Sequence, residues 1–271
     1  MTTGDIRAEP LAGVRGGWRV QISHPGKLNA MSRAMWRQLR VVFEQLAADP
    51  DARCIVVQGH GDAFCAGGDI SEYPAFRFDE AALREFHEGD VWGGLAAMLA
   101  CDVPIIASIQ GACMGAGVEI ASCCDIRIAS ASARFGAPIA KLGFPMAPRE
   151  AQLVAGAVGD AVARRMLLEA ATFSAAEFLA CGFLSQAVPD VELHEATLVS
   201  AGRIAALAPQ AARMNKQTFR ALKQPLAHAS QEQVAIKNIV NDACANAYRY
   251  ADSAEHREGI GAFLAKRKPD F

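Results

Sequence analysis

The sequence predicts an α/β fold followed by a helical C-terminal region. Up to about residue 147, short apolar segments with strand character alternate with glycine-rich turns and helical segments. Beyond that point helical periodicity dominates. With 271 residues, 52% of them apolar, the chain can form one large domain, or one domain with an appendage.

The individual elements follow from local patterns. In the first half, strands are expected over 18–23, 54–58, 104–110 and 125–130, and helices over 32–47, 81–100 and 116–123. Ser32 is a suitable N-cap for the first helix. In the second half, helices are expected over 149–158, 160–169, 174–180, 191–207, 210–223 and 231–250, with a last helix ending near 263–267. Such an apolar helical tail either packs on its own core or forms an oligomer interface, and the pattern favours neither.

Composition narrows the class of protein. Charged residues make up 21% of the chain and the formal net charge is −2, so there is no electrostatic reason to expect a nucleic acid or an anionic membrane as partner. No segment is apolar over the roughly 18 residues of a membrane span, and the N-terminus lacks a secretory pattern. Eight cysteines, mostly within apolar runs, indicate reduced buried thiols in a cytoplasmic protein, and no metal site is expected.

Several common catalytic motifs are missing from the sequence. There is no phosphate-binding G-x-x-x-x-G-K-[ST], no G-x-G-x-x-G opening a helix after a strand, and no G-x-S-x-G. His87-Glu88 begins an H-E-x-x-H pattern, but its fifth position is Val91. Local patterns therefore give no support to nucleotide, triad or metal chemistry.

Two turns built from small residues, 63–70 and 111–119, each follow a predicted strand. Such turns can present backbone N–H groups to a ligand, and the second also opens a helix. Brought together, they would form an oxyanion hole, which suits chemistry that develops charge on a carbonyl oxygen. The alternative is that both are close-packed turns in a tight fold.

Glu119 strengthens the functional interpretation. It lies one helical turn after Gly115, among small or apolar neighbours. Carboxylates are seldom buried without a partner or a task, and desolvation would raise the pKa of this one toward the range useful for acid–base catalysis. The alternative is a buried ion pair, for instance with Arg127.

At these positions the sequence resembles the enoyl-CoA hydratase/isomerase family, also called the crotonase superfamily. The similarity spans nearly the whole chain, in segments 24–31, 63–70, 104–111, 115–119, 124–129, 133–138 and 258–269. It implies a spiral core of ββα units followed by a helical trimerisation region, with the core at 1–200 and the helical oligomerisation region at 201–271. It also implies a homotrimer or homohexamer.

The resemblance further implies an acyl-CoA substrate, with coenzyme A as part of the substrate and no separate cofactor. The thioester oxygen would be held by the N–H groups of Gly68 and Ala116, and Glu119 would be the acid–base residue. The remaining substrate-binding residues would be Lys27, Leu28, Ala66, Gly67, Asp69, Ile70, Gly115 and Ile139. The expected activity is hydration and dehydration of an enoyl-CoA in fatty acid metabolism.

One position departs from the family pattern. Hydratases of the family carry a second glutamate where this chain has Ile139, and an isoleucine can neither position a water nor deliver a proton. Substitute acids could come from Glu150 or from Glu85, His87, Glu88 and Asp90, although each of these side chains is expected to be solvent-exposed. The alternatives are therefore other crotonase-type chemistry (isomerisation, decarboxylation, C–C or thioester hydrolysis) and a CoA-thioester-binding protein without hydratase activity.

Overall fold

The computed structural model describes residues 3–222 and 254–271. The helix expected over 231–250 lies outside the described residues. The main sheet has six strands in the order β1 (Asp5–Pro10), β2 (Gly17–Ser23), β3 (Cys54–Gly59), β4 (Ile105–Ile109), β6 (Ile126–Ser130) and β9 (Gln186–Val188). The β1 strand is antiparallel to β2, and the other neighbours are parallel. A smaller sheet orders β5 (Ala112–Met114), β7 (Arg134–Gly136) and β8 (Thr172–Ser174).

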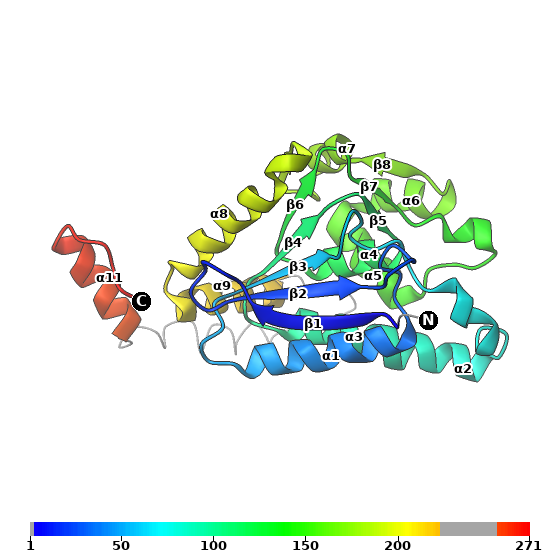
Figure 1. Cartoon of the computed structure of the whole chain (residues 1–271), viewed down its shortest axis with the longest axis horizontal. Helices are drawn as coiled ribbons and strands as arrows, with labels where there is room; N and C mark the ends of the chain where they lie inside the picture. Colours follow the sequence, from blue (N-terminus) through cyan, green and yellow to red (C-terminus); the bar gives the residue numbers. More distant parts are fainter. Residues whose placement is uncertain (1–2, 223–253) are drawn as a thin grey trace, which may run out of the picture.

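The central strands β3 and β4 are buried on both faces, which explains their nearly continuous apolar sequences. On one face, α1 (Arg33–Ala48) packs against β1 and against α3 (Trp92–Ala100), burying Trp36 and Phe43 among its apolar residues. On the other face, α8 (Leu193–Ala205) contacts β3, β4 and β6 (Figure 1). Alternation along β3 follows these layers, because Ile55 and Val57 join the larger core and Val56 joins the core under α8.

The helix expected over 81–100 is confirmed, with a π-helical turn inside it that was not predicted. The structure divides it into α2 (Glu80–Glu85), a π-helical turn η2 (Phe86–Val91) and α3. The other predicted helices are confirmed as α1, α4 (Ala116–Cys123), α5 (Pro148–Val158), α6 (Asp160–Leu168), α7 (Ala175–Ala180), α8 and α9 (Pro209–Leu222), and α11 (Ala254–Leu264) is the last. Three short 3-10 turns complete the described elements: η1 (Ile70–Ala75), η3 (Pro138–Leu142) and η4 (Asp190–Glu192).

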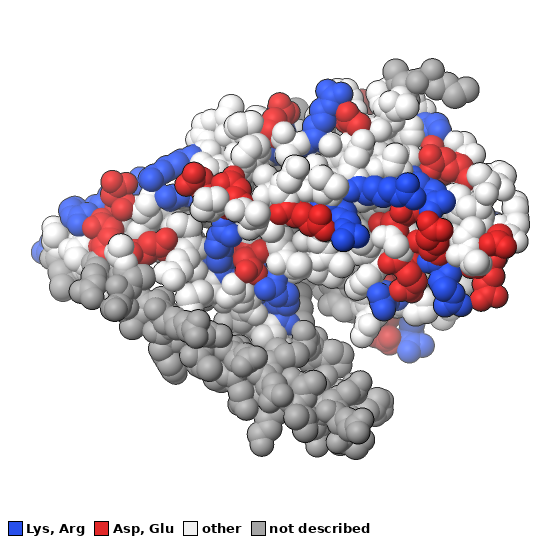
Figure 2. Space-filling model, turned by 90° about the horizontal axis from the view of Figure 1, so that it is seen from below, with Lys and Arg blue, Asp and Glu red and all other residues white. Residues whose placement is uncertain are grey.

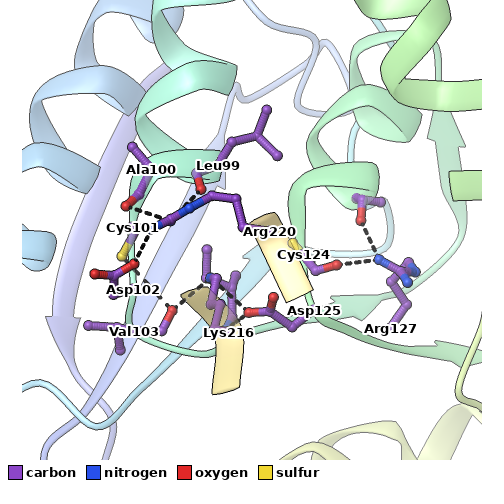
Figure 3. A network of polar contacts seen from close by, with 12 residues as sticks. Leu99, Ala100, Cys101, Asp102, Val103, Cys124, Asp125, Arg127, Lys216 and Arg220 are labelled. Atoms are coloured by element: carbon purple, nitrogen blue, oxygen red, sulfur yellow. Dashed lines mark hydrogen bonds and ion pairs between the residues drawn. The ribbon is translucent and has the colours of Figure 1, made fainter. Parts of the chain in front are cut away.

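Helix α9 packs back on the chain's own core through buried and half-buried polar contacts (Figure 3). Lys216 Nζ lies 2.8 Å from Asp125 Oδ2 and donates to the Val103 carbonyl at 2.9 Å. Arg220 pairs with Asp102 at 2.6 Å and donates to the carbonyls of Leu99 and Ala100. The sequence left open whether the helical tail packs on its own core or forms an oligomer interface. The structure shows that α9 packs on the core.

The mixture of charges on the surface and the burial of the cysteines agree with what the composition predicts. Figure 2 shows acidic and basic side chains interspersed over one face of the molecule. Six of the seven cysteines in the described residues are buried and all seven are free thiols, with Cys181 exposed.

Within residues 3–222 and 254–271, no helix combines the length and apolarity that crossing a bilayer requires, and no cluster of three or more potential metal ligands occurs.

Two glycines give a matched test of the close packing around α4. A methyl group at Gly117 would lie 2.6 Å from the Cys65 carbonyl oxygen, whereas one at Gly156 in α5 meets no atom within 4 Å. Gly117→Ala should lower the free energy of unfolding by about 1–3 kcal/mol through overpacking. Gly156→Ala should raise it by about 0.5–1 kcal/mol through helix propensity. Urea denaturation measures both, and equal effects would contradict the packing described for Gly117.

Candidate active site

The two small-residue turns expected to meet do lie side by side. Cys65 and Cys113 form a parallel bridge, in which the Cys65 N–H donates to the Ala112 carbonyl at 2.9 Å. The Met114 N–H donates to the Cys65 carbonyl at 2.8 Å. Gly115 is tied in turn to the smaller sheet, because its N–H donates to the Gly136 carbonyl at 2.8 Å. The two turns therefore form one rigid unit between the sheets.

Glycine is required at two points of this unit. Gly67 has φ +117° and Gly115 has φ +47°, both in the region that L side chains seldom adopt. Each is also close to the facing turn, since a methyl group at Gly115 would lie 3.6 Å from Gly67 Cα. A methyl group at the next glycine, Gly68, would lie 2.2 Å from the Tyr73 hydroxyl. These three glycines therefore place backbone without side chains in the wall of the cavity described next.

Two backbone N–H groups of this unit are available to a ligand. Ala116 is the first residue of α4, so its N–H has no acceptor within the helix. In the described part of the chain, the Gly68 N–H has no hydrogen-bond acceptor either, because its neighbours Gly67 and Asp69 make the bridge to Met31. Both residues line one cavity. The pair is thus placed to hold a carbonyl oxygen that gains negative charge.

The cavity has a volume of about 230 Å³, which is several times the roughly 30 Å³ that one water occupies in the liquid. Eight of the eleven predicted site residues line it: Ala66, Gly67, Gly68, Ile70, Gly115, Ala116, Glu119 and Ile139. These eight are among the 21 residues that line the cavity, so sequence reasoning located the part of the wall formed by the two turns.

The other three predicted residues lie beside the cavity without lining it. Lys27 Nζ contacts Asp69 Oδ2 at 2.6 Å and also donates to Ser71. Burial opposes ionisation of Asp69, but the hydrogen bonds from Lys27 and Ser71 lower the pKa of its carboxyl below the ordinary value. Leu28 is 62% exposed in a left-handed conformation, and its carbonyl accepts the Ala66 N–H at 3.0 Å. This loop thus supports the backbone of the first turn.

Glu119 projects from the first turn of α4 into the cavity. Desolvation, and next the charge of Glu150, raise the pKa of the Glu119 carboxyl to about 8. The alternative partner, Arg127, is occupied at the other end of the helix, where it donates to the carbonyls of Ala121, Cys124 and Phe183. At neutral pH Glu119 is therefore a protonated acid next to two unpaired N–H groups.

The expectation of solvent exposure is wrong for three of the candidate substitute acids. Glu150 is only 2% exposed, because α5 carries it into the interior in its first turn, where it lies 3.2 Å from His87 Nδ1. Asp90 is buried because it pairs with Arg33 and Arg37. His87 is half-buried and lines the cavity.

For the other two candidates, Glu85 and Glu88, the expected exposure is confirmed. Their side chains pair at the surface with Arg33 and Arg149, at 3.5 and 3.1 Å. Neither lines the cavity.

An aromatic wall of the cavity was not predicted. Tyr73, Phe86 and Phe144 line it, and the ring of Tyr73 contacts both of the others edge to face. Burial is the main cause that raises the pKa of the Tyr73 phenol. Arg77 stacks on Tyr73 and Phe144 in the same wall. Tyr73 lies in η1, Arg77 follows it and Phe144 follows η3, in segments where the sequence has no periodic signal, whereas Phe86 begins η2.

Comparison with known proteins matches this fold and these turns to one family. The sequence profile described as enoyl-CoA hydratase/isomerase matches residues 16–271. The chain belongs to the enoyl-CoA hydratase/isomerase family. It is 32% identical over 253 residues to a probable enoyl-CoA hydratase of Mycobacterium bovis, covering 93% of each chain. It is 30% identical over 250 residues to the 2,3-dehydroadipyl-CoA hydratase of Escherichia coli, covering 92% of each.

Solved structures of this family share the fold. A crystal structure titled enoyl-CoA hydratase/carnithine racemase from Magnetospirillum magneticum superposes with a TM-score of 0.89 at 32% identity, covering 100% of this chain and 96% of that one. Human enoyl-CoA hydratase domain-containing protein 3 superposes with a TM-score of 0.79 at 29% identity, covering 98% and 99%. The crotonase fold expected from the sequence is thus confirmed.

The raised pKa of Glu119 predicts a pH-dependent stability. In the unfolded chain its carboxyl ionises near 4.5, but in the folded protein near 8, so folding is disfavoured progressively as pH rises between these values. The full pKa shift would lower the free energy of unfolding by at most about 5 kcal/mol, and water that enters the cavity reduces this effect.

Glu119→Gln cannot ionise and should escape this loss. Its free energy of unfolding relative to wild type should therefore increase from pH 5 to pH 8 by about 2–4 kcal/mol, in urea titrations at several pH values. A difference that stays constant over this range would contradict a buried protonated carboxyl at position 119.

Proposed function

We propose that the protein catalyses the reversible addition of water to the double bond of an enoyl-CoA thioester. The observation that carries the proposal is Glu119 in one cavity with the available N–H groups of Gly68 and Ala116. The two N–H groups would stabilise the enolate oxygen, and one such donor contributes roughly 3 kcal/mol. Glu119 would exchange a proton with the substrate. The names of the relatives as hydratases support this reaction over others of the family.

The rest of the thioester would follow the turns outward. The coenzyme A would run along the backbone of Ala66 and Gly67 and past the loop of Lys27 and Leu28, while the acyl group would enter the aromatic part of the cavity beside Ile139. Coenzyme A is then part of the substrate, and the mechanism uses no separate cofactor.

A second candidate keeps the thioester site but changes the reaction. Ile139 supplies no proton and lines the cavity where a second acid–base group would be useful. This favours isomerisation, decarboxylation, C–C or thioester hydrolysis, or binding alone, all of which could use the same two N–H groups. Hydration removes the absorbance of the conjugated thioester, whereas binding alone leaves it unchanged. Analysis of the products distinguishes hydration from the other reactions.

The assembly proposed for the protein is a homotrimer or a homohexamer in the cytoplasm, with residues 201–271 contributing the interface. Phe219 and Leu222 on α9 support it, because these apolar side chains are 67% and 69% exposed in the single chain. Buried free thiols support a reducing compartment. Light scattering of the purified protein measures the assembly.

Removal of the Glu119 carboxyl tests the proposed chemistry. Wild type should hydrate crotonyl-CoA, and Glu119→Gln should lower kcat about 10²–10⁴-fold with KM within about threefold, because the substituted amide cannot donate a proton. Glu85→Gln, the same change at an exposed side chain, is the control and should keep full activity. Undiminished turnover by Glu119→Gln would contradict the assigned role, and a wild type without hydratase activity on short or long enoyl-CoAs would contradict the reaction.

A further inference from the structure

A second titratable pair lies at the same cavity. Glu150, in the first turn of α5, places Oε1 3.2 Å from Nδ1 of His87, which belongs to the π-helical turn η2. The Glu150 side chain is 3% exposed and that of His87 is 22% exposed. His87 lines the cavity together with Glu119, whereas Glu150 lies behind it. A π-helical turn between two α-helices often marks a functional position.

The environment of Glu150 indicates that it acts on His87. Within the described residues, His87 is the hydrogen-bonding partner of the Glu150 carboxyl, because the adjacent Arg149 pairs with Glu88 instead. The Glu150 carboxyl lies in the first turn of α5, where the helix dipole favours a negatively charged group. Its charge reaches the active site, since it contributes to raising the pKa of Glu119.

The contact also fixes the orientation of the ring. When the neutral imidazole donates its Nδ1–H to Glu150, the lone pair is on Nε2, at the other side of the ring. Because His87 lines the cavity while Glu150 does not, Nε2 is the nitrogen available to a bound molecule. A carboxylate held in this way also stabilises the imidazolium that forms on proton uptake.

We infer that His87, oriented by Glu150, is the second acid–base group of the reaction, in place of the group that Ile139 lacks. The inference rests on the proposed hydration. During hydration, the oxygen of water bonds to the β-carbon, and one water proton passes to Nε2 of His87. The π electrons of the double bond move to the thioester enolate on Gly68 and Ala116, and the enolate α-carbon then takes the proton of Glu119.

This assignment follows from position. Glu119 lies one helical turn from Ala116, next to the expected thioester oxygen and hence near the α-carbon. His87 comes from another wall and would serve the more distant β-carbon. After product release His87 is an imidazolium and Glu119 a carboxylate, and proton exchange through solvent restores both.

The other charged groups near η2 are engaged elsewhere. Asp90 pairs with Arg33 and Arg37, and Glu88 pairs with Arg149. Glu85 lies 3.5 Å from Arg33 at the surface. Within the described residues, Glu150 is therefore the acidic group that contacts His87.

The test compares His87→Gln, Glu150→Gln and the surface control Glu88→Gln with wild type, measuring crotonyl-CoA hydration from pH 5 to 9. His87→Gln should lower kcat about 10²–10⁴-fold with KM within about threefold. Glu150→Gln should lower kcat about 10–100-fold, because the neutral amide no longer stabilises the imidazolium that forms when His87 takes a proton. Glu88→Gln should match wild type.

A direct readout accompanies the kinetics. In ¹⁵N-histidine NMR of wild type, neutral His87 should be protonated at Nδ1, and this preference should be lost in Glu150→Leu. The Nε2–H tautomer in wild type would overturn the positioning role of Glu150. If wild type hydrates crotonyl-CoA and Glu119→Gln does not, full kcat in His87→Gln would overturn the role of His87 while the hydratase function stands. A wild type that hydrates no enoyl-CoA would overturn both.

A separate observation concerns the acyl group. The Arg77 guanidinium lies 4.6 Å from the ring centroid of Tyr73 and 3.5 Å from that of Phe144, in the wall of the cavity. Burial lowers the pKa of Arg77 below its ordinary value, although it stays protonated at neutral pH. No carboxylate within 3–222 or 254–271 forms an ion pair with it. Its guanidinium N–H groups can therefore form charge-assisted hydrogen bonds with a bound anion.

We propose that Arg77 binds a carboxylate at the far end of the acyl group, so that the preferred substrate is an enoyl-CoA derived from a dicarboxylic acid. The proposal also rests on the hydratase function. The stacked rings hold the guanidinium plane and leave its edge for a bidentate contact with a carboxylate. A phosphate of coenzyme A is the other anion that Arg77 could meet, and it would be common to all substrates.

The test is the ratio of kcat/KM for 2,3-dehydroadipyl-CoA to that for crotonyl-CoA, in wild type and Arg77→Met. The substitution keeps much of the packing volume but removes the charge. The ratio should exceed 1 in wild type and fall at least tenfold in Arg77→Met. An equal loss on both substrates would assign Arg77 to a phosphate or to packing and overturn the proposal, while activity on crotonyl-CoA alone upholds the hydratase function.

Discussion

The site depends on one backbone contact, the parallel bridge between Cys65 and Cys113 that joins the two small-residue turns. It fixes the separation of the Gly68 and Ala116 N–H groups, which belong to segments nearly fifty residues apart in the chain. The turns come this close because Gly117 leaves no side chain against the Cys65 carbonyl and because glycine at 67 and 115 permits the positive φ angles of the backbone. The first turn follows β3 and the second contains β5, so their backbones are held in place. The two N–H donors are therefore positioned before any substrate binds, as electrostatic stabilisation of an oxyanion requires.

The same packing determines the behaviour of Glu119. Helix α4 begins at the second turn and is buried along nearly its whole length, so its carboxyl is removed from water except through the cavity. Arg127 could have neutralised it, but it satisfies the carbonyls at the C-terminal end of α4. Arg127 thus stabilises the C-terminal end of α4, away from the cavity. In the part of the chain that the structure describes, Glu119 in the first turn is left without a cationic partner, which lowers the free energy of unfolding as pH rises.

How much of this site the sequence could predict depends on the range of the interactions. The two small-residue turns and Glu119 could be singled out from local sequence, and the resemblance to the family pointed to Gly68 and Ala116 within those turns. His87 and Glu150 could not be paired, because they are 63 residues apart and the contact depends on how η2 and α5 pack. The expected single helix over 81–100 also hid the π-helical turn, which changes the faces that successive residues present. Arg77 and Tyr73 lie in an aperiodic segment, where no sequence pattern indicates which way a side chain points.

Ile139 acquires a physical meaning once Glu150 is known to be buried. The charge of Glu150 already contributes to raising the pKa of Glu119, and a further carboxylate at position 139 would make ionisation of Glu119 more costly still. An isoleucine there keeps that part of the cavity apolar, which favours the protonated form of Glu119. The second proton then needs a group whose charged form is cationic, because a cation is stabilised by the carboxylates that would destabilise another anion. A histidine held by Glu150 meets that requirement.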